Sequence, residues 1–122
     1  MDIGLSASVR LVVGEQDTAV ALGSGDVPVL GTPRVVALVE EATVAAVRDA
    51  LAPTQTTVGT RVDVEHLRAS AVGATVEVLA TLEIVEGSRL QFAVAVTQDG
   101  REVARGRVTR QVVDRERFLS RL

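Results

Sequence analysis

The side chain of this sequence best placed for chemistry is Glu40, a carboxylate in an otherwise apolar stretch. Residues 31–51 are predicted to form one helix, and at about 100° per residue its other charged side chains fall on one narrow polar stripe. That stripe holds Arg34, Glu41, Arg48 and Asp49. Glu40 lies off the stripe, beside Val36 and Val47, where a carboxylate is buried or half-buried and is therefore expected to be paired or hydrogen-bonded.

His66, the only histidine of the chain, is expected to face the same helix. Counting in twos along the surrounding strand places it on the same side as Val62 and Val64, with the charged residues between them on the other side. Histidine is a base near neutral pH and a glutamate can orient it, as acid–base and nucleophilic sites require. The alternative is a core histidine that bonds a backbone carbonyl.

Thr32 is the third candidate, because it stands where the helix begins. It is expected to be the N-cap, with Pro33 in the first helical position. The positive end of the helix dipole at this point also favours anions and developing oxyanions. Thr32 and Glu40 are eight residues apart, roughly 12 Å along a helix, so they cannot touch within it. Either the segment of Gly31 and Thr32 bends back with His66 as a bridge, or a two-fold interface completes the site.

Charge and composition exclude several function classes. A net charge of −3, a pI near 5.1 and an aromatic content of 2% argue against nucleic-acid binding. The chain has no cysteine and no lysine, which excludes thiol and Schiff-base chemistry, and a single histidine makes a metal centre built by the protein unexpected. No apolar run reaches the ~18 residues of a membrane span, and the N-terminus lacks a secretory pattern, so a cytoplasmic protein is expected.

The 122 residues, 47% of them hydrophobic, predict a single domain over residues 1–122. Alternating patterns predict strands at 5–13, 57–69, 75–85, 89–98 and 102–113, a segment 18–22 that pairs back on the first strand, and a loop at 23–30. The last four strands are expected to form a meander, with turns at Gly73, at Glu86, Gly87 and Ser88, and at Asp99 and Gly100. Residues 114–122 are expected to be a short helix or a frayed end.

The residues expected on the inner face of these strands are apolar and need a cover. They are Val62, Val64, Val76, Val78, Ala80, Leu82, Ile84, Leu90, Phe92, Val94, Val96, Ala104, Val108 and Val112. Only the 31–51 helix is long enough, so we predict an α+β fold in which one curved antiparallel sheet of about five strands wraps around one long central helix. One helix does not cover such a sheet, and its edge strands stay free, which indicates a dimer.

Four strings of the sequence resemble, in order and spacing, those of the hotdog-fold acyl-CoA thioesterases, in the branch typified by fluoroacetyl-CoA thioesterase. The helix entry and helix read GTPRVVALVEEA, and the next strand reads VGTRVDVEH. The two strings that follow are AxxVGATVEV and VEGSRLQFAV. The resemblance covers about residues 31–113 and implies a single hotdog domain.

The resemblance implies roles for individual residues. The family's catalytic threonine, helix glutamate and histidine fall on Thr32, Glu40 and His66, and Gly59 matches a glycine that lines the acyl-thioester site. A backbone N–H near Gly59, or at Gly31 where the helix begins, would hold the oxyanion. In the family the thioester is hydrolysed at a dimer interface without a metal or redox cofactor. The resemblance implies that His66 is the base, and it leaves open whether Thr32, Glu40 or water is the nucleophile.

Arg110 matches an arginine commonly found in the family, and it stands on the inward register of the last strand. There it is expected to approach the pantetheine or the phosphates of the substrate. The alternative is a surface charge on an edge strand, because long arginine side chains reach solvent from such positions.

The resemblance implies an acyl-CoA substrate. One departure from the family's sequence pattern bears on which acyl group it carries. Family members that select fluoroacetyl-CoA carry phenylalanines in the loop before the threonine, whereas residues 23–30 contain none, so another short or medium acyl group is expected. Two alternatives remain: a non-catalytic module that binds acyl-CoA, and a hotdog hydratase or dehydratase acting on a β-hydroxyacyl chain. Pairing of two dimers into a tetramer is left open.

Overall fold

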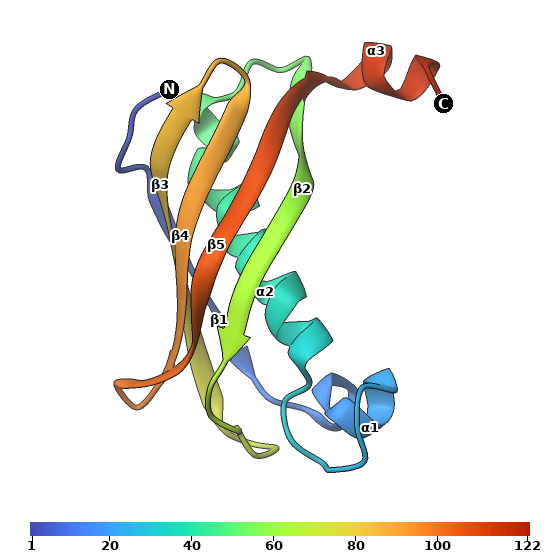
Figure 1. Ribbon diagram of the computed structural model, residues 1–122, viewed down its shortest axis with the longest axis vertical. Helices are drawn as coiled ribbons and strands as arrows, with labels where there is room; N and C mark the ends of the chain where they lie inside the picture. The colour runs from blue at the N-terminus through green and yellow to red at the C-terminus, as the bar shows by residue number, and fades with distance from the viewer.

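The structure is a computed structural model that describes residues 1–122. It consists of five strands, one long helix and several short helical segments (Figure 1). In chain order the elements are β1 (Ser6–Val12), η1 (Glu15–Asp17), α1 (Ala19–Leu22), α2 (Thr32–Val47), η2 (Arg48–Ala50), β2 (Gln55–His66), β3 (Thr75–Glu86), β4 (Arg89–Gln98), β5 (Arg101–Asp114) and α3 (Arg115–Ser120). The helix expected over 31–51 therefore divides into α2 and the 3-10 turn η2.

The five strands form one antiparallel sheet in the order β1-β3-β4-β5-β2, which wraps around α2 (Figure 1). The turn between β4 and β5 consists of Asp99 and Gly100, both with positive φ, as tight hairpins require. The predicted meander that included β2 is wrong, because β2 pairs with β5 and β1 lies beside β3. The predicted α+β architecture of a five-stranded sheet around a central helix is confirmed, and β1 and β2 are its two edges.

The core forms where α2 packs into the sheet. Buried side chains recur every three or four residues along the helix: Val35, Leu38, Val39, Ala42, Thr43, Ala46 and Val47. They face fully buried strand residues such as Val78, Leu82 and Phe92. Burying one such side chain contributes roughly 1.5–3 kcal/mol, so the core fixes where the polar residues of α2 lie. None of the helices has the length and apolar character that a membrane crossing requires.

Two irregularities in the sheet change which side chains point inward. In β3 the register shifts between Leu82 and Ile84, so Ile84 is 39% exposed and the prediction that it faces the core is wrong. In β2 the register against β5 shifts between Gly59 and Arg61. Because of this bulge at Thr60, both Gly59 and His66 face α2, although they are an odd number of residues apart.

The segment before α2 is helical rather than extended. Residues 18–22 were expected to pair back as a strand, but Thr18 caps the short helix α1, accepting a hydrogen bond from the N–H of Ala21 at 3.2 Å. Within residues 18–22 only Thr18 forms a β-bridge, and its partner is Leu30. The prediction failed because a short apolar run fits either a helix or a strand, and the capping threonine decides it.

One side of the molecule is hollowed along the β2 edge. In Figure 1, α1 and its loop project at one end of this side and α3 projects at the other. Between them, α2 presents Val36 and Glu40, half-buried, and Val44, 37% exposed. The residues 114–122, expected to be a short helix or a frayed end, contain α3, which is capped by the carboxylate of Asp114.

Candidate active site

Thr32 and His66 form the first of two polar clusters on the helix side of the sheet. Oγ1 of Thr32 lies 2.8 Å from Nδ1 of His66. Thr32 is the first residue of α2 and His66 is the last residue of β2, so the beginning of the helix meets the end of the strand here. When the imidazole is neutral and carries its proton on Nε2, the hydroxyl donates to Nδ1, and the ring is placed to take the hydroxyl proton.

The predicted capping role of Thr32 is wrong, because Gly31 occupies the N-cap position and Thr32 is already helical. The hydroxyl of Thr32 therefore bonds His66 instead of the helix backbone. Gly31 does not offer an oxyanion donor, since its N–H donates to the backbone carbonyl of Asp17 at 2.9 Å. A side chain at Gly31 would approach the backbone of Ala19 to 3.1 Å, so this glycine serves close packing.

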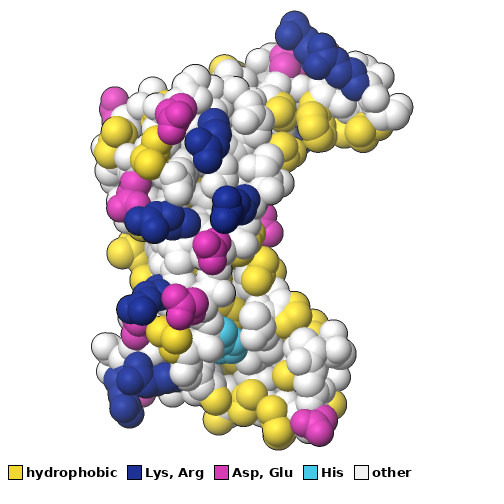
Figure 2. All heavy atoms as spheres, in the orientation of Figure 1, with side chains coloured by type: hydrophobic (Ala, Val, Ile, Leu, Met, Phe, Trp, Pro, Cys, Tyr) yellow, Lys and Arg dark blue, Asp and Glu magenta, His cyan; other side chains and the backbone are white.

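The surroundings of His66 favour the neutral form of its imidazole. Burial lowers the pKa of His66 from the ordinary value of 6.5, and the nearby backbone of Arg68 offsets part of this lowering. Its Nε2 atom is buried and has no hydrogen-bond partner within the chain. A cavity of about 230 Å³ opens beside the ring, lined by Thr32, Leu30 and Leu67 among others. Figure 2 shows the histidine at the surface of the hollowed side.

Glu40 and Arg110 belong to the second cluster, farther along α2. Nη1 of Arg110 donates to Oε2 of Glu40 at 3.0 Å, while Nε and Nη2 donate to Oγ1 and the backbone carbonyl of Thr57 at 2.9 and 3.1 Å. The side chain of Arg110 is 7% exposed and that of Glu40 is 35% exposed. The surface-charge alternative for Arg110 is therefore wrong, and the half-buried, paired Glu40 agrees with the prediction.

Gly59 allows the carboxylate of Glu40 to lie against β2. A Cβ at Gly59 would collide with Oε2 of Glu40 and would come within 3.2 Å of Nη1 of Arg110. The cluster thus holds a carboxylate between a buried guanidinium and bare backbone, which fixes its position. No group of three or more His, Asp or Glu side chains lies close enough in the chain to hold a metal ion.

The two clusters do not meet within one chain. Roughly 12 Å along α2 separates Thr32 from Glu40, and roughly 20 Å along β2 separates Gly59 from His66. The hydrogen bonds of Glu40 go to Arg110, whereas those of the His66 ring go to Thr32. The alternative in which His66 bridges Thr32 and Glu40 within one chain is therefore wrong.

Sequence reasoning missed the buried ion pair that holds the beginning of α2. Asp17 is 4% exposed, and its carboxylate accepts from Nε of Arg34 at 2.9 Å and from the N–H of Gly14 at 2.8 Å. Arg34 had been placed on the solvent-facing stripe. The available signal was a cation in the first turn of a helix, which is unfavourable beside the positive helix end unless a carboxylate neutralises it.

Comparison with known proteins identifies the family. The model of a family described as "Fluoroacetyl-CoA-specific thioesterase" matches residues 13–116, a stretch that contains both polar clusters. The chain belongs to this family. The fluoroacetyl-CoA thioesterase of Streptantibioticus cattleyicolor is 35% identical over 94 residues, which cover 77% of this chain and 68% of that protein. The resemblance seen in the sequence is thereby confirmed.

Solved structures of thioesterases agree with the fold. A structure of the fluoroacetyl-CoA thioesterase FlK matches with a TM-score of 0.92 and 31% identity, covering 99% of this chain and 94% of that one. A thioesterase superfamily member from Thermus thermophilus matches with a TM-score of 0.91 and 25% identity, covering 98% of this chain and 88% of that one. The family membership and the fold together identify the protein as a thioester hydrolase, which confirms the prediction from the sequence.

Proposed function

We propose that the protein is a cytoplasmic, homodimeric acyl-CoA thioesterase whose active site takes Thr32 and His66 from one chain and Glu40, Gly59 and Arg110 from the other. The observation that carries this proposal is that each chain holds two well-formed half-sites too far apart to act together. Hydrolysis in such a site releases a free carboxylic acid and the CoA thiol, with a water molecule consumed.

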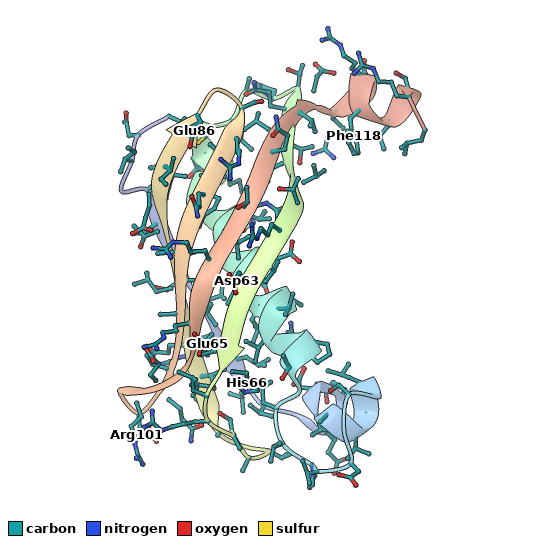
Figure 3. The ribbon with its side chains drawn as sticks, viewed as in Figure 1. Asp63, Glu65, His66, Glu86, Arg101 and Phe118 are labelled. Atoms are coloured by element: carbon teal, nitrogen blue, oxygen red, sulfur yellow. The ribbon has the colours of Figure 1, made fainter.

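The β2 edge supplies the contact that would unite the half-sites. If two copies of β2 pair antiparallel around Asp63, Val62 lies opposite the partner's Val64. Beyond the bulge at Thr60, Gly59 then lies opposite the partner's His66, and all of these residues face the helix side. Asp63 is the ninth of the twelve residues of β2 and His66 is the last (Figure 3), so this pairing uses the C-terminal two thirds of the strand, residues 59–66.

The outer face of β2 supports the same register. In that pairing, Arg61 lies opposite the partner's Glu65, and by symmetry Glu65 lies opposite the partner's Arg61. Neither side chain forms an ion pair within its own chain, and both are exposed. Cross-strand pairs of opposite charge stabilise a sheet, so the charges favour the register that brings Gly59 to the partner's His66.

The geometry supports a two-step reaction. His66 takes the proton of Thr32, and Oγ1 attacks the thioester carbon, so that the C–S bond breaks and the CoA thiolate leaves with the proton from His66. Water then attacks the acyl carbon and gives a proton to the carboxylate of the partner's Glu40 or to His66. The bond between the acyl carbon and Oγ1 breaks, the acid leaves, and the same base returns the proton to Oγ1 of Thr32. The partner's Arg110 holds that carboxylate in place through a hydrogen bond of 3.0 Å. The α2 dipole at Thr32 favours the oxyanion.

The pocket favours a small acyl group. The cavity of about 230 Å³ beside His66 is smaller than the ~300–1,000 Å³ of sites that hold drug-sized ligands. Residues 23–30, the loop before Thr32, have no aromatic side chain to select fluoroacetyl-CoA. We therefore propose a short or medium acyl-CoA other than fluoroacetyl-CoA as the substrate.

The test is the release of free CoA thiol from a series of acyl-CoAs, from acetyl to decanoyl, by the wild type and by His66→Ala. We expect hydrolysis of at least one member, and a loss of a hundredfold or more in the variant. Mass spectrometry of the wild type under turnover should show an acyl group on the peptide that contains Thr32. Release of no thiol, with binding of acyl-CoA retained, would instead favour a non-catalytic binding module, and an enoyl absorbance change would favour a hydratase.

A further inference from the structure

The C-terminal arm, defined here as α3 together with Arg121 and Leu122, carries an apolar face with no cover in its own chain. Phe118, Leu119 and Leu122 are 38%, 56% and 91% exposed. At about 100° per residue they fall within one side of the helix. Figure 2 shows hydrophobic atoms on the side of the arm that faces the hollow and basic side chains on the opposite side.

The arm is held at its base and not along its length. The carboxylate of Asp114 accepts the N–H of Arg117 at 3.0 Å, and the N–H of Arg115 donates to the carbonyl of Thr54 at 2.9 Å. These bonds fix the direction in which the arm leaves the sheet. These hydrogen bonds therefore hold the arm so that it extends beyond the β2 edge with its apolar face uncovered (Figure 1).

A second apolar surface without a cover lies at the other end of the molecule, on the segments that border the pocket. Val20, Leu22, Val27 and Leu67 are 53%, 42%, 51% and 45% exposed. We call these four residues the pocket rim, since they lie on α1, on the loop before Thr32 and directly after His66. Leu67 itself lines the cavity beside the imidazole. Large apolar patches of this kind mark interaction sites in soluble proteins.

We propose that the C-terminal arm of each subunit docks on the pocket rim of its partner and closes the apolar wall of the partner's acyl pocket. This proposal rests on the dimer proposed above. An antiparallel pair of β2 strands turns one molecule end for end against the other, so the end that carries α3 meets the end that carries the partner's His66. Gln55, which pairs with Asp114 at the base of the arm, lies just beyond the end of the partner's β2 in that register.

The charges of the C-terminal arm and of the pocket rim are complementary, which supports docking of the arm on the rim of a second copy of the chain. The arm has three arginines, Arg115, Arg117 and Arg121, against one glutamate. The rim end has the carboxylates of Asp26 and Glu15, neither of which forms an ion pair in its own chain. Arg68, the one cation beside the pocket, donates to the carbonyl of Glu102. A second copy of the chain thus offers the arm an apolar surface bordered by acidic groups.

The absence of native cysteine allows a direct test by disulfide trapping. Leu119→Cys and Val27→Cys are combined in one chain, and the protein is oxidised mildly. Residues 119 and 27 lie on the two projecting segments at opposite ends of the molecule (Figure 1), so a disulfide between them must join two chains. We expect a covalent dimer on a non-reducing gel for the pair, and none for either single variant.

The control pair combines Leu119→Cys with Leu79→Cys, which is exposed to 46% on β3 and is expected to stay uncrosslinked. A dimer in sedimentation without the 119–27 disulfide would overturn the arm while leaving the proposed dimer intact. A fully monomeric protein would overturn both. Disulfide trapping does not depend on hydrolysis. A protein that hydrolyses acyl-CoA but forms no 119–27 disulfide would therefore contradict the docking of the arm and leave the proposed function intact.

The double variant Phe118→Ser/Leu119→Ser gives a second readout. If the arm forms part of the acyl pocket, the KM for the preferred acyl-CoA should rise about tenfold with kcat less affected, because the apolar wall binds substrate without taking part in bond breaking. Unchanged KM values across the acyl series, in a variant that is still dimeric, would contradict the role of the arm in the pocket.

Discussion

The two half-sites on α2 differ in nearly every physical property. The Thr32–His66 pair is neutral, partly open to solvent and linked by one hydrogen bond of 2.8 Å. The cluster of Glu40 and Arg110 is charged, is anchored by three hydrogen bonds from one buried guanidinium, and uses Gly59 to make room. The first provides a hydroxyl beside an imidazole, and the second provides a carboxylate that a buried arginine holds in place.

Sequence separation along one helix can therefore divide a site rather than assemble it. Residues eight apart on α2 lie roughly 12 Å apart, a distance that no side chain in either cluster spans. A two-fold axis near Asp63 would bring each neutral pair to the charged cluster of the other chain. The dimer would then carry two identical sites, each incomplete in the monomer.

The largest expected effect comes from removing the charge of the second cluster. Glu40→Gln should lower kcat by a hundredfold or more, because the amide cannot accept a proton and leaves Arg110 unpaired. Glu41→Gln, a change of the same kind on the exposed neighbour, is the matched control and should leave kcat near that of the wild type. Equal kcat values for the two variants would show that the charged cluster takes no part in the reaction.

A smaller effect is expected when the charged cluster is displaced but kept. Gly59→Ala places a methyl group where Oε2 of Glu40 lies, so the carboxylate must swing away. We expect kcat to fall about tenfold with a melting temperature close to that of the wild type, since the long glutamate side chain moves more easily than the strand. A normal kcat would mean that the position of Glu40 against β2 is unimportant.

The proposed register can be tested by exchanging charges on the outer face of β2. Arg61→Glu should weaken the dimer several-fold, because it sets two carboxylates opposite each other twice per dimer. Arg61→Glu combined with Glu65→Arg restores opposite charges across the strands and should recover the dimer. Sedimentation equilibrium measures both, and a double variant as weak as the single one would contradict the register.

The pH dependence of kcat/KM should follow the protonation of His66. The pKa of His66 is lowered by burial, so the base stays unprotonated below the ordinary value of 6.5. The acid limb of kcat/KM should therefore have its midpoint below pH 6.5. Stability should fall over the same window as the pH drops, because the unfolded chain binds this proton at a higher pH than the folded chain. A midpoint above 6.5 would contradict the burial of the ring.

Periodicity alone predicted the features that depend on local pattern. It predicted the central helix, five strand segments, the inward face of His66 and the paired state of Glu40, because side-chain alternation and helical period are set by neighbouring residues. It misplaced Ile84, since a bulge that shifts the register has no clear signature in a run of apolar residues. It also misplaced β2 in the sheet, because the pairing of β2 with β5 joins residues that are far apart in the sequence.

The candidate site was predicted as a set of residues but not as a geometry. Thr32 was read as a cap, yet Gly31 takes that position and frees the hydroxyl. The buried pair of Asp17 and Arg34 was missed because both residues fit exposed positions of a turn and a helix. Such pairs depend on how the loop before α2 folds back, which local sequence does not specify.

If each active site is built from two chains, a mixture of two inactive variants should regain activity. His66→Ala and Glu40→Gln chains are co-refolded in equal amounts, so that half of the dimers are mixed and each mixed dimer has one complete site. We expect about one quarter of wild-type activity to return. His66→Ala mixed with Thr32→Val is the control and should stay inactive, since both changes fall in the same half-site. No recovery in the first mixture, with mixed dimers demonstrated, would contradict the shared site.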